Sequence, residues 1–295
     1  MRIIVAGGTG FVGSALIRRL SVEGHHVTLI VRPGSEMKIP ERSEVEAVWL
    51  DPGEPLTGLD LIGDVIINLV GIIREFPFRG ITFEKAHFVI TKNLVDFAKA
   101  KGVSRFLQMS ALGVGPDGKT GYTRSKFKAE EYVRSSKVNW TIFRPSMIIG
   151  PGDHVTGMFS RMIKYLPAVP VVGNGEYKLQ PVHVDDICTG FVKALSDDRS
   201  MGKVFEFGGP EVLLFNRMLD IMGEALGKKK VRKIHLPVRI MRIKAAIWGR
   251  FPWFPITNEQ ITMLLDDNYT DDGSLYELFD FQPKQFRESL KEILR

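Results

Sequence analysis

Short apolar runs alternate with amphipathic segments over the first half of the chain. The run from Ile3 to Ala6 follows one charged residue, which is typical of a strand buried on both faces of a parallel sheet. The next segment has helical spacing, with apolar Leu16 and Leu20, and Gly24 is placed to end that helix. Because a second apolar run covers 27–31, these elements predict a βαβ unit.

The same alternation continues to about residue 150. Apolar runs predict further strands, and helical spacing predicts the helices between them. The expected strands cover 45–50, 61–71, 105–109 and 140–143, and the expected helices cover 83–101 and a segment from Gly121 onward. Strands that alternate with helices form parallel sheets with right-handed crossovers. The chain is therefore predicted to be an α/β protein with a Rossmann-type doubly wound parallel sheet.

The alternation weakens after residue 150. The sequence Gly173-Asn174-Gly175 predicts a hairpin turn, and Asp185 and Asp186 are expected at the positive end of a helix. A strand at 204–207 and a helix at 215–226 follow. We predict an NAD(P)-binding domain over 1–175, to which 182–210 returns, and a smaller α/β lobe for a substrate or partner over 211–295.

Composition narrows the class of protein. A length of 295 residues with 44% hydrophobic residues suffices for one large domain or two interleaved ones. The net charge of +6 suits an anionic cofactor and requires no nucleic acid. The single cysteine, Cys188, excludes an internal disulfide framework and is expected to be a small buried residue. We expect no signal peptide, and the longest apolar run, 65–73, is shorter than the ~20 residues of a membrane-spanning helix.

Three glycines follow the first strand, at the start of the first helix. Gly7 permits a tight turn, Gly10 lets the backbone approach a pyrophosphate, and Gly13 lets the helix lie close to the strand. The first amides of a helix have no intrahelical acceptor and favour an anion. The spacing predicts a dinucleotide site, whose cofactor-binding residues here are Gly7, Thr9, Gly10, Phe11, Val12 and Gly13.

The end of the second strand indicates which dinucleotide binds. Sites that prefer NAD commonly place an acidic residue about 20 residues after the glycines, where it accepts a hydrogen bond from the ribose 2′-hydroxyl. This chain has Arg32 instead, in the turn Arg32-Pro33-Gly34-Ser35. A guanidinium suits a 2′-phosphate, so we predict NADP(H) rather than NAD(H). The alternative is a solvated arginine in a turn.

Two more strand ends are expected beside the cofactor, because the carboxyl ends of parallel strands meet at one edge of the sheet. Asp51 follows the third strand, and its carboxylate is placed to accept a hydrogen bond from an adenine amino group. The fourth strand continues into Leu69, Val70 and Gly71, which we expect to lie under the cofactor.

Tyr122 and Lys126 are the candidate reactive pair. They are four residues apart and therefore share one face of a helix. A neighbouring ammonium stabilises a phenolate and is expected to lower the tyrosine pKa from about 10, so that the phenol exchanges a proton with a substrate hydroxyl or carbonyl. The same lysine can donate to the nicotinamide ribose. The spacing alone occurs by chance, but the position about a dozen residues after the fifth strand supports the assignment.

Four motifs, in this order, resemble the extended short-chain dehydrogenase/reductase superfamily over about residues 1–210. They are Gly7-Gly-Thr-Gly-Phe-Val-Gly13, Tyr122-Thr-Arg-Ser-Lys126, Arg144-Pro145-Ser-Met-Ile148-Ile-Gly150 and Val182-His183-Val184-Asp185-Asp186. Among the branches, the chain most resembles the atypical group that contains the nucleotide-binding accessory subunit of respiratory complex I. That narrower resemblance depends on Asn68-Leu69-Val70-Gly71, on Ser110-Ala111-Leu112-Gly113 and on the Pro- and Trp-rich tail. The resemblance implies that Lys126, Pro145 and Ile148 also contact the cofactor.

One position departs from the pattern of working enzymes in the superfamily. They usually have Ser or Thr two or three residues past the fifth strand, whereas this chain has Ala111 there and Ser110 one place early. An alanine cannot donate a hydrogen bond, and the loss of such a contact typically costs a few kcal/mol of transition-state stabilisation. The subgroup therefore implies a tightly held NADPH with a structural or assembly role. The alternative is an NADPH-dependent reductase, epimerase or dehydratase with Tyr122, Lys126 and Ser110 as catalytic residues; its small-molecule substrate and the oligomeric state stay open.

The segment 228–256 mixes basic residues with aromatic ones. Such a surface suits contact with an anionic membrane or a membrane protein, which would make a cytoplasmic protein peripheral to the inner membrane. The alternative is a lobe whose aromatic side chains pack under the sheet and whose lysines are solvated. Pro237, Pro252 and Pro255 favour this alternative, because proline interrupts a long helix. The six histidines show no metal-ligand spacing, so we predict no metal site.

Overall fold

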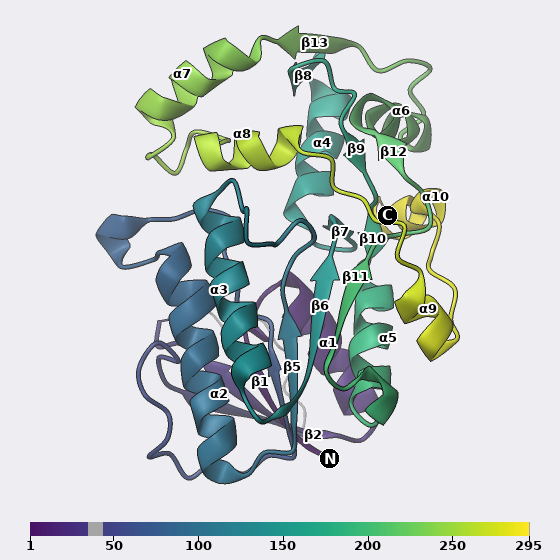
Figure 1. Ribbon diagram of the computed structural model, residues 1–295. Helices are drawn as coiled ribbons and strands as arrows, with labels where there is room; N and C mark the ends of the chain where they lie inside the picture. Colours follow the sequence, from purple (N-terminus) through teal and green to yellow (C-terminus); the bar gives the residue numbers. More distant parts are fainter. Residues whose placement is uncertain (35–43, 295) are drawn as a thin grey trace. The chain divides into compact units, whose positions relative to one another are not determined.

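The computed structural model describes residues 1–34 and 44–294 (Figure 1). The chain divides into two compact units. Unit 1 comprises 1–145, 184–206 and 272–281, and unit 2 comprises 146–183, 207–271 and 282–295. The predicted domains instead placed 146–175 with the nucleotide-binding part and 272–281 with the lobe. The difference arises because the strands within 146–183 pair with one another or with later parts of unit 2.

Unit 1 is built on a seven-stranded sheet with the order β11-β6-β5-β4-β1-β2-β3. The strand pairs β1–β2, β2–β3, β1–β4, β4–β5 and β5–β6 are all parallel. This arrangement confirms the predicted doubly wound α/β fold. The strands are β1 (Arg2–Ala6), β2 (His26–Val31), β3 (Val45–Trp49), β4 (Val65–Asn68), β5 (Arg105–Met109), β6 (Asn139–Pro145) and β11 (Lys203–Phe207).

Helices cover both faces of this sheet. Figure 1 shows α2 (Ile90–Lys101) and α3 (Gly121–Ser135) on one face, and α1 (Phe11–Val22) and α5 (Val184–Ala194) on the other. The helix α9 (Ser274–Phe279) packs against α5. Shorter turns are the 3-10 helices Pro77–Arg79 and Asp198–Ser200, and a π-helical segment, Glu84–Val89, directly precedes α2.

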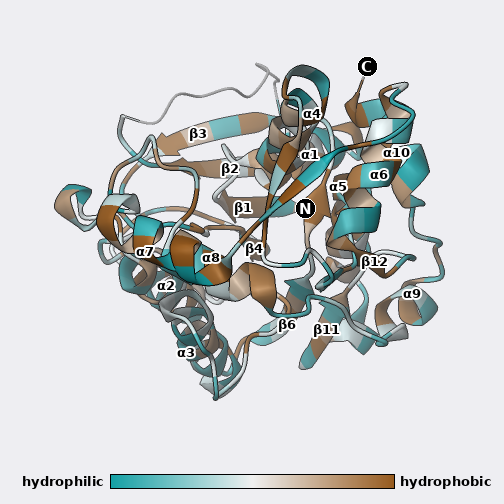
Figure 2. Ribbon diagram, turned by 90° about the horizontal axis from the view of Figure 1, so that it is seen from above, coloured by the Kyte–Doolittle hydropathy of each residue, from teal (hydrophilic) through white to brown (hydrophobic). Residues whose placement is uncertain are grey.

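The core of unit 1 follows the apolar pattern of the sequence. Ile3 to Ala6 are completely buried, and Figure 2 shows the apolar colour of the neighbouring strands. Leu94 and Phe97 of α2 pack in one cluster with Phe106 of β5. Cys188 is buried as predicted, and its burial raises the pKa of the thiol to about 12.

Local signals set the ends of these helices. Thr120 accepts a hydrogen bond from the Thr123 N–H, and the Thr123 side chain accepts one from the Thr120 N–H, so a capping box starts α3 at Gly121. Gly24 follows α1 with φ +76°, and Gly102 ends α2 with φ +65°, conformations that favour glycine. The end of α1 was predicted from Gly24, and the end of α2 agrees with the expected helix over 83–101.

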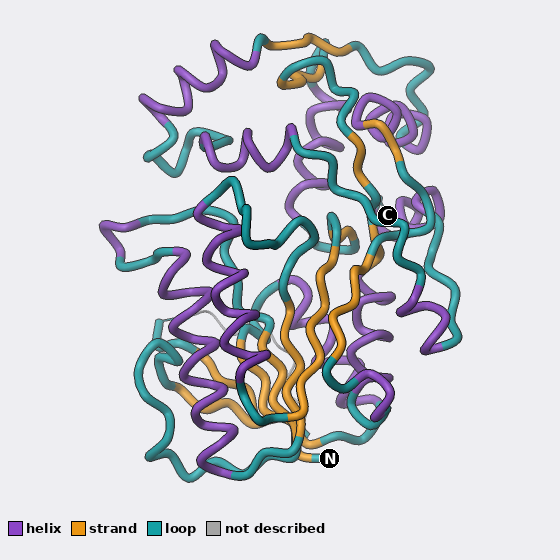
Figure 3. The backbone as a smooth tube through the Cα atoms, in the orientation of Figure 1, coloured by secondary structure: helices purple, strands orange, loops and turns teal. Residues whose placement is uncertain are grey.

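Unit 2 contains three two-stranded sheets (Figure 3). The hairpin predicted at Gly173 is wrong. The strand before that turn, β8 (Val169–Val172), pairs in parallel with β13 (Lys233–Leu236), and the strand after it, β9 (Lys178–Leu179), pairs with β12 (Leu213–Leu214). The third sheet pairs β7 (Ile148–Ile149) with β10 (Val182–His183). The turn residues therefore identified the turn itself but not the strand partners.

Five helices complete unit 2 around two apolar clusters. They are α4 (His154–Tyr165), α6 (Phe215–Ala225), α7 (Val238–Trp248), α8 (Asn258–Leu265) and α10 (Phe286–Ile293). In the larger cluster, the rings of Tyr177 and Phe215 stack with centroids 5.0 Å apart. Among the described residues of both units, no helix combines the length and apolar character needed to cross a membrane.

Candidate functional site

The predicted nucleotide loop lies at the point where the strand order of the sheet reverses. β1 pairs with β2 on one side and with β4 on the other, and ligands of open parallel sheets bind outside the carboxyl ends at such a point. Gly7 follows β1, and Leu69 and Val70 follow β4. A Cβ on Gly7 would lie 2.8 Å from the Leu69 carbonyl carbon and from the Val70 nitrogen. The structure thus brings three of the predicted cofactor-binding residues together.

The glycines of this loop have different steric surroundings. Gly7 has φ +83°, as a tight turn requires, and a Cβ on Gly13 would lie 2.4 Å from the Gly7 carbonyl oxygen. A Cβ on Gly10 would meet only that oxygen, at 3.4 Å. Gly8 was missed by the sequence analysis; a Cβ there would lie 2.2 Å from the Leu29 side chain. Backbone contacts therefore require glycine at Gly7 and Gly13, a Cβ on Gly8 would meet side-chain ends, and Gly10 is sterically open.

The start of α1 has the properties of an anion site. Gly10 is the N-cap, no side chain caps the helix, and the first turn holds no acidic residue. The N–H groups of the first turn, which includes Phe11, Val12 and Gly13, have no intrahelical acceptor, and the helix dipole is positive there. These residues fit the pyrophosphate of a dinucleotide, whose phosphates they would bind through backbone N–H groups.

The ends of β2 and β3 bring opposite charges together. Arg32 is exposed directly after β2. Partial burial acts to raise the pKa of Asp51, but the Gly53 N–H, 2.9 Å from the carboxylate, and Lys85 Nζ, 3.0 Å from it, lower that pKa overall, with a smaller contribution from the charge of Arg32. Lys85 was not predicted, because no strand-end signal marks it. Ser35, the last residue of the predicted turn, lies outside the described residues.

The candidate reactive pair lies on α3 with a histidine beside it. Lys126 Nζ is 5.5 Å from the centroid of the Tyr122 ring and donates a 3.3 Å hydrogen bond to the Met109 carbonyl. The His87 ring meets the Tyr122 ring edge-on, with centroids 5.1 Å apart. A Cβ on Gly71 would lie 3.6 Å from Lys126 Nζ, so the loop after β4 reaches this group. His87 was missed, because a lone histidine in a helical pattern carries no distinguishing signal.

The electrostatics of this pair differ from the prediction. Burial raises the pKa of Tyr122 above its ordinary value of 10.0, so the expectation that Lys126 lowers it is wrong. Burial also lowers the pKa of Lys126 to about 8, against the opposing charge of Glu130. The physical reason is that the buried phenol would lose the hydration that stabilises a phenolate, which disfavours the charged form of Tyr122. The sequence could show the spacing of the pair but not its burial.

Burial of His87 is expected to make the stability of the fold depend on acid. Burial, with a contribution from Lys126, lowers its pKa from 6.5 to about 3, so the unfolded chain binds a proton between pH 6.5 and 3 that the folded chain does not. Stability therefore falls as the pH falls through this window, by about 2 kcal/mol between pH 7 and 5. Urea unfolding at both pH values measures the loss. The variant His87→Gln should lose this part of the slope, whereas His26→Gln, at an exposed position, should keep it; equal slopes in all three proteins would contradict the prediction.

Ser110 holds a buried hydroxyl at the end of β5. Its N–H donates a 2.7 Å bond to the Phe143 carbonyl, but among the described residues its Oγ has no hydrogen-bond partner. At the end of β4, the Asn68 amide donates to Thr91 at 2.9 Å and to Gln108 at 3.0 Å, which links the ends of β4 and β5. Buried hydroxyls are normally paired, so Ser110 is free to bond a group that enters the site.

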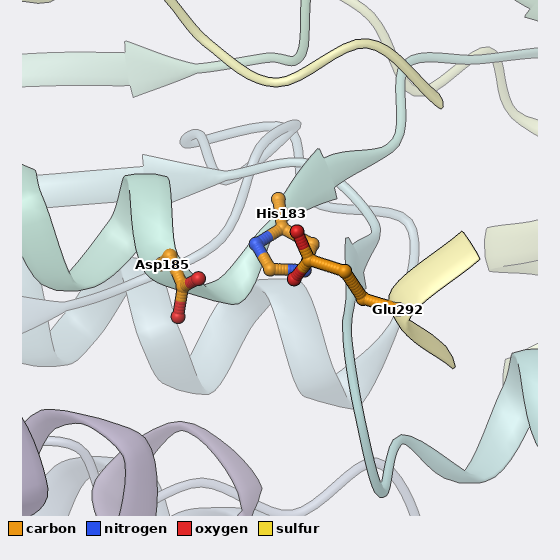
Figure 4. A group of neighbouring side chains, drawn as sticks. All are labelled: His183, Asp185 and Glu292. Atoms are coloured by element: carbon orange, nitrogen blue, oxygen red, sulfur yellow. The ribbon is translucent and has the colours of Figure 1, made fainter. Parts of the chain in front are cut away.

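The two remaining cofactor candidates fall on different units. Pro145 ends β6 in unit 1 and accepts a 2.9 Å hydrogen bond from the Leu112 N–H. Ile148 belongs to unit 2, where it pairs with Val182. His183 of unit 2 has Nε2 3.6 Å from a Glu292 carboxylate oxygen. Figure 4 labels these two residues and Asp185, which lies on the first turn of α5. Exposed carboxylates beside a histidine are common without an ion, and we assign no metal to them.

A model of the NAD dependent epimerase/dehydratase family matches residues 3–208. The chain belongs to this family. It is 32% identical to the mitochondrial "NADH dehydrogenase [ubiquinone] 1 alpha subcomplex subunit 9" of Arabidopsis thaliana, over 98% of this chain and 76% of that protein. It is 29% identical to a ceramide reductase of Caulobacter vibrioides, over 64% of this chain and 59% of that protein. These matches confirm the predicted resemblance to the extended superfamily and to the complex I subunit group.

The fold has close counterparts among solved structures. The UDP-glucuronic acid 4-epimerase of Bacillus cereus, in complex with UDP-glucuronic acid and NAD, superimposes with a TM-score of 0.77. The comparison covers 99% of this chain and 97% of that one, at 19% identity. At this identity the likeness shows the fold, which agrees with the Rossmann-type sheet of unit 1.

Proposed function

We propose that this protein binds NADP(H) at the loop between β1 and α1 and holds it in a structural or assembly role, as an atypical member of the extended short-chain dehydrogenase/reductase superfamily. The proposal depends on a contrast between cofactor binding and catalysis. The start of α1 is open to phosphates at Gly10. After β5, however, Ala111 stands where working enzymes of the superfamily usually have a hydrogen-bond donor, Ser or Thr. The relatives named as complex I subunits support an accessory role.

The direct test is to identify the small molecule that purifies with the native protein. We expect mass spectrometry of the denatured protein's supernatant to find NADP⁺ or NADPH at about one per chain. Titration of cofactor-free protein, followed by nicotinamide fluorescence, should then give tighter binding of NADPH than of NADH. A protein that is folded and binds neither coenzyme would contradict the proposal.

The preference for NADP(H) depends on Arg32. In the variant Arg32→Asp, the guanidinium that would meet the 2′-phosphate becomes a carboxylate that can accept from a 2′-hydroxyl. We expect NADPH affinity to fall by about 10- to 100-fold, since a charge-assisted hydrogen bond contributes about 1.5–3 kcal/mol, while NADH affinity rises. The ratio of the two dissociation constants measures the change. An unaltered ratio would mean that Arg32 is a solvated turn residue.

A second function, that of an active reductase, epimerase or dehydratase, is favoured by Ser110. Its Oγ is buried and without a partner among the described residues, which suits a hydrogen bond to a substrate oxygen. The relative named as a ceramide reductase agrees with this alternative. Turnover of a hydroxyl or carbonyl substrate that Tyr122→Phe abolishes, with NADPH affinity unchanged, would establish the enzyme. An unaltered cellular phenotype of Tyr122→Phe would support the structural role.

We also propose that the protein acts at a membrane-bound assembly. Relatives are subunits of mitochondrial NADH dehydrogenase by name, which supports association with a membrane complex. The segment 228–256 is the proposed contact with a membrane or a membrane protein, and the location is cytoplasmic and peripheral to the inner membrane. No contact with nucleic acid is needed to account for the charge of the chain.

A further inference from the structure

The segment 228–256 of unit 2 is uniformly basic. It contains nine lysines and arginines and no aspartate or glutamate. One of its lysines, Lys233, forms an ion pair with Asp220, which belongs to α6 and lies outside the segment. Because the segment itself holds no acidic residue, its positive charge favours a negatively charged partner. Nucleotide binding in unit 1 does not use this segment.

The helix α7 carries two different apolar faces. Met241 and Ala245 are buried and pack with Val172, Phe254 and Ile261 in the smaller core cluster of unit 2. A second row, spaced three and four residues apart, points to solvent: Ile240, Ile243 and Ile247 are 49%, 62% and 54% exposed. These three isoleucines do not contribute to the core, because Met241 and Ala245 on the other face of the helix already make the core contacts. An exposed apolar row of this kind indicates a binding surface.

Aromatic residues extend this exposed apolar row beyond the end of α7. Trp253 is 68% exposed and its ring stacks on Phe251, with centroids 6.0 Å apart. Trp248 is also exposed, and among the described Trp and Phe residues of 228–256 only Phe254 is buried. The interpretation that the aromatics pack in the core is therefore wrong for these positions. That interpretation was favoured because prolines were expected to interrupt a long helix, but Pro237 and Pro252 lie outside α7 and leave it uninterrupted.

Basic side chains flank the exposed row. Arg239, Arg242 and Lys244 lie on exposed turns of α7, and Figure 2 shows polar and apolar residues side by side on this helix. Arg250 follows the helix, and its guanidinium carbon lies 4.9 Å from the centroid of the Phe251 ring. Long cationic side chains around apolar and aromatic residues are the pattern of helices that lie in the plane of a membrane surface.

We propose that α7 and the turn after it, residues 238–253, bind the surface of an anionic lipid bilayer. Ile240, Ile243, Ile247 and Trp253 enter the region between headgroups and acyl chains, and the neighbouring arginines and lysines meet lipid phosphates and carboxylates. This inference makes the membrane contact of the proposed function specific to lipid, and it is independent of the cofactor. A bilayer surface fits both observations, because its interior accepts the exposed apolar row and each basic residue near its anionic headgroups contributes about 1 kcal/mol.

Vesicle flotation tests the proposal with the full chain. We expect the protein to float with vesicles of phosphatidylcholine containing 30% phosphatidylglycerol, to float at least about tenfold less with pure phosphatidylcholine, and to be released by high salt, because surface charges are screened. Tryptophan emission should shift to shorter wavelength with the anionic vesicles. Bromine-labelled acyl chains should quench it, since Trp248 and Trp253 lie in the bound segment.

Two pairs of substitutions and one control identify the surface. Ile243→Ser with Trp253→Ser, and separately Arg239→Gln with Lys244→Gln, should each lower the bound fraction at least about tenfold. Tyr165→Ser, at another exposed residue of unit 2, should bind as the wild type does. NADPH affinity should be equal in all of them, which separates this proposal from the cofactor proposal. Wild-type protein that stays unbound with anionic vesicles, or binding that both pairs leave unchanged, would overturn the lipid assignment.

Discussion

Replacing Gly10 with alanine is expected to abolish most dinucleotide binding and to leave the fold intact. The added Cβ would meet only the Gly7 carbonyl oxygen, at 3.4 Å, which is an ordinary contact, so we expect the unfolding free energy to stay within about 1 kcal/mol of the wild type. The methyl group would stand where the pyrophosphate must approach the backbone. NADPH affinity should therefore fall by about 100-fold, or about 2.7 kcal/mol, in a fluorescence titration.

Two other glycines provide controls for this experiment. Gly58→Ala adds a Cβ into open space on an exposed turn, so both stability and affinity should match the wild type. Gly13→Ala places a Cβ 2.4 Å from the Gly7 oxygen and 2.5 Å from the Gly8 Cα, so it should reduce stability by about 1–3 kcal/mol as well as affinity. If Gly10→Ala binds NADPH like Gly58→Ala, the cofactor does not use this loop.

The sequence predicted the part of the fold in which local pattern and long-range pairing agree. Buried parallel strands appear as continuous apolar runs, so β1 and β5 were located to within a residue. The right-handed crossover rule then leaves few possible arrangements of such strands. The predicted bounds of a strand were less accurate where the strand continues into a loop of the candidate site. The expected strand 61–71 shortens to Val65–Asn68, because the chain after Asn68 leaves the sheet toward the nucleotide loop.

The strand pairing of unit 2 could not be predicted, because its strands are short and their partners are distant in sequence. A two-residue strand such as β9 shows no periodicity, and its pairing with β12 spans more than thirty residues. The site was limited in a similar way. Motif spacing located Tyr122 and Lys126, but their pKa values depend on burial, which tertiary packing sets. The partners Lys85 and His87 lie on a π-helical segment that no sequence signal marks.

A buried carboxylate supports α3, the helix that carries the candidate reactive pair. Glu130 is completely buried, and both of its oxygens accept hydrogen bonds from Arg144, at 2.9 and 2.6 Å. Arg134 donates a third bond, at 2.8 Å, from the next turn of the helix. The pair joins α3 to β6, because Arg144 belongs to that strand. Such bidentate pairs are strong only while both partners are present.

Removing Glu130 is therefore expected to be the most destabilising of the changes proposed for unit 1. Glu130→Ala leaves the largely buried Arg144 guanidinium without its bidentate carboxylate, and breaking one side of a buried ion pair costs about 3–5 kcal/mol. Urea unfolding at pH 7 measures the loss. The matched control is Glu131→Ala, because Glu131 is the next residue, is exposed, and also pairs with Arg134, at 3.0 Å; its loss should stay below about 1 kcal/mol. Similar losses in the two variants would show that burial adds nothing to this pair, and the link between α3 and β6 would then depend on apolar packing.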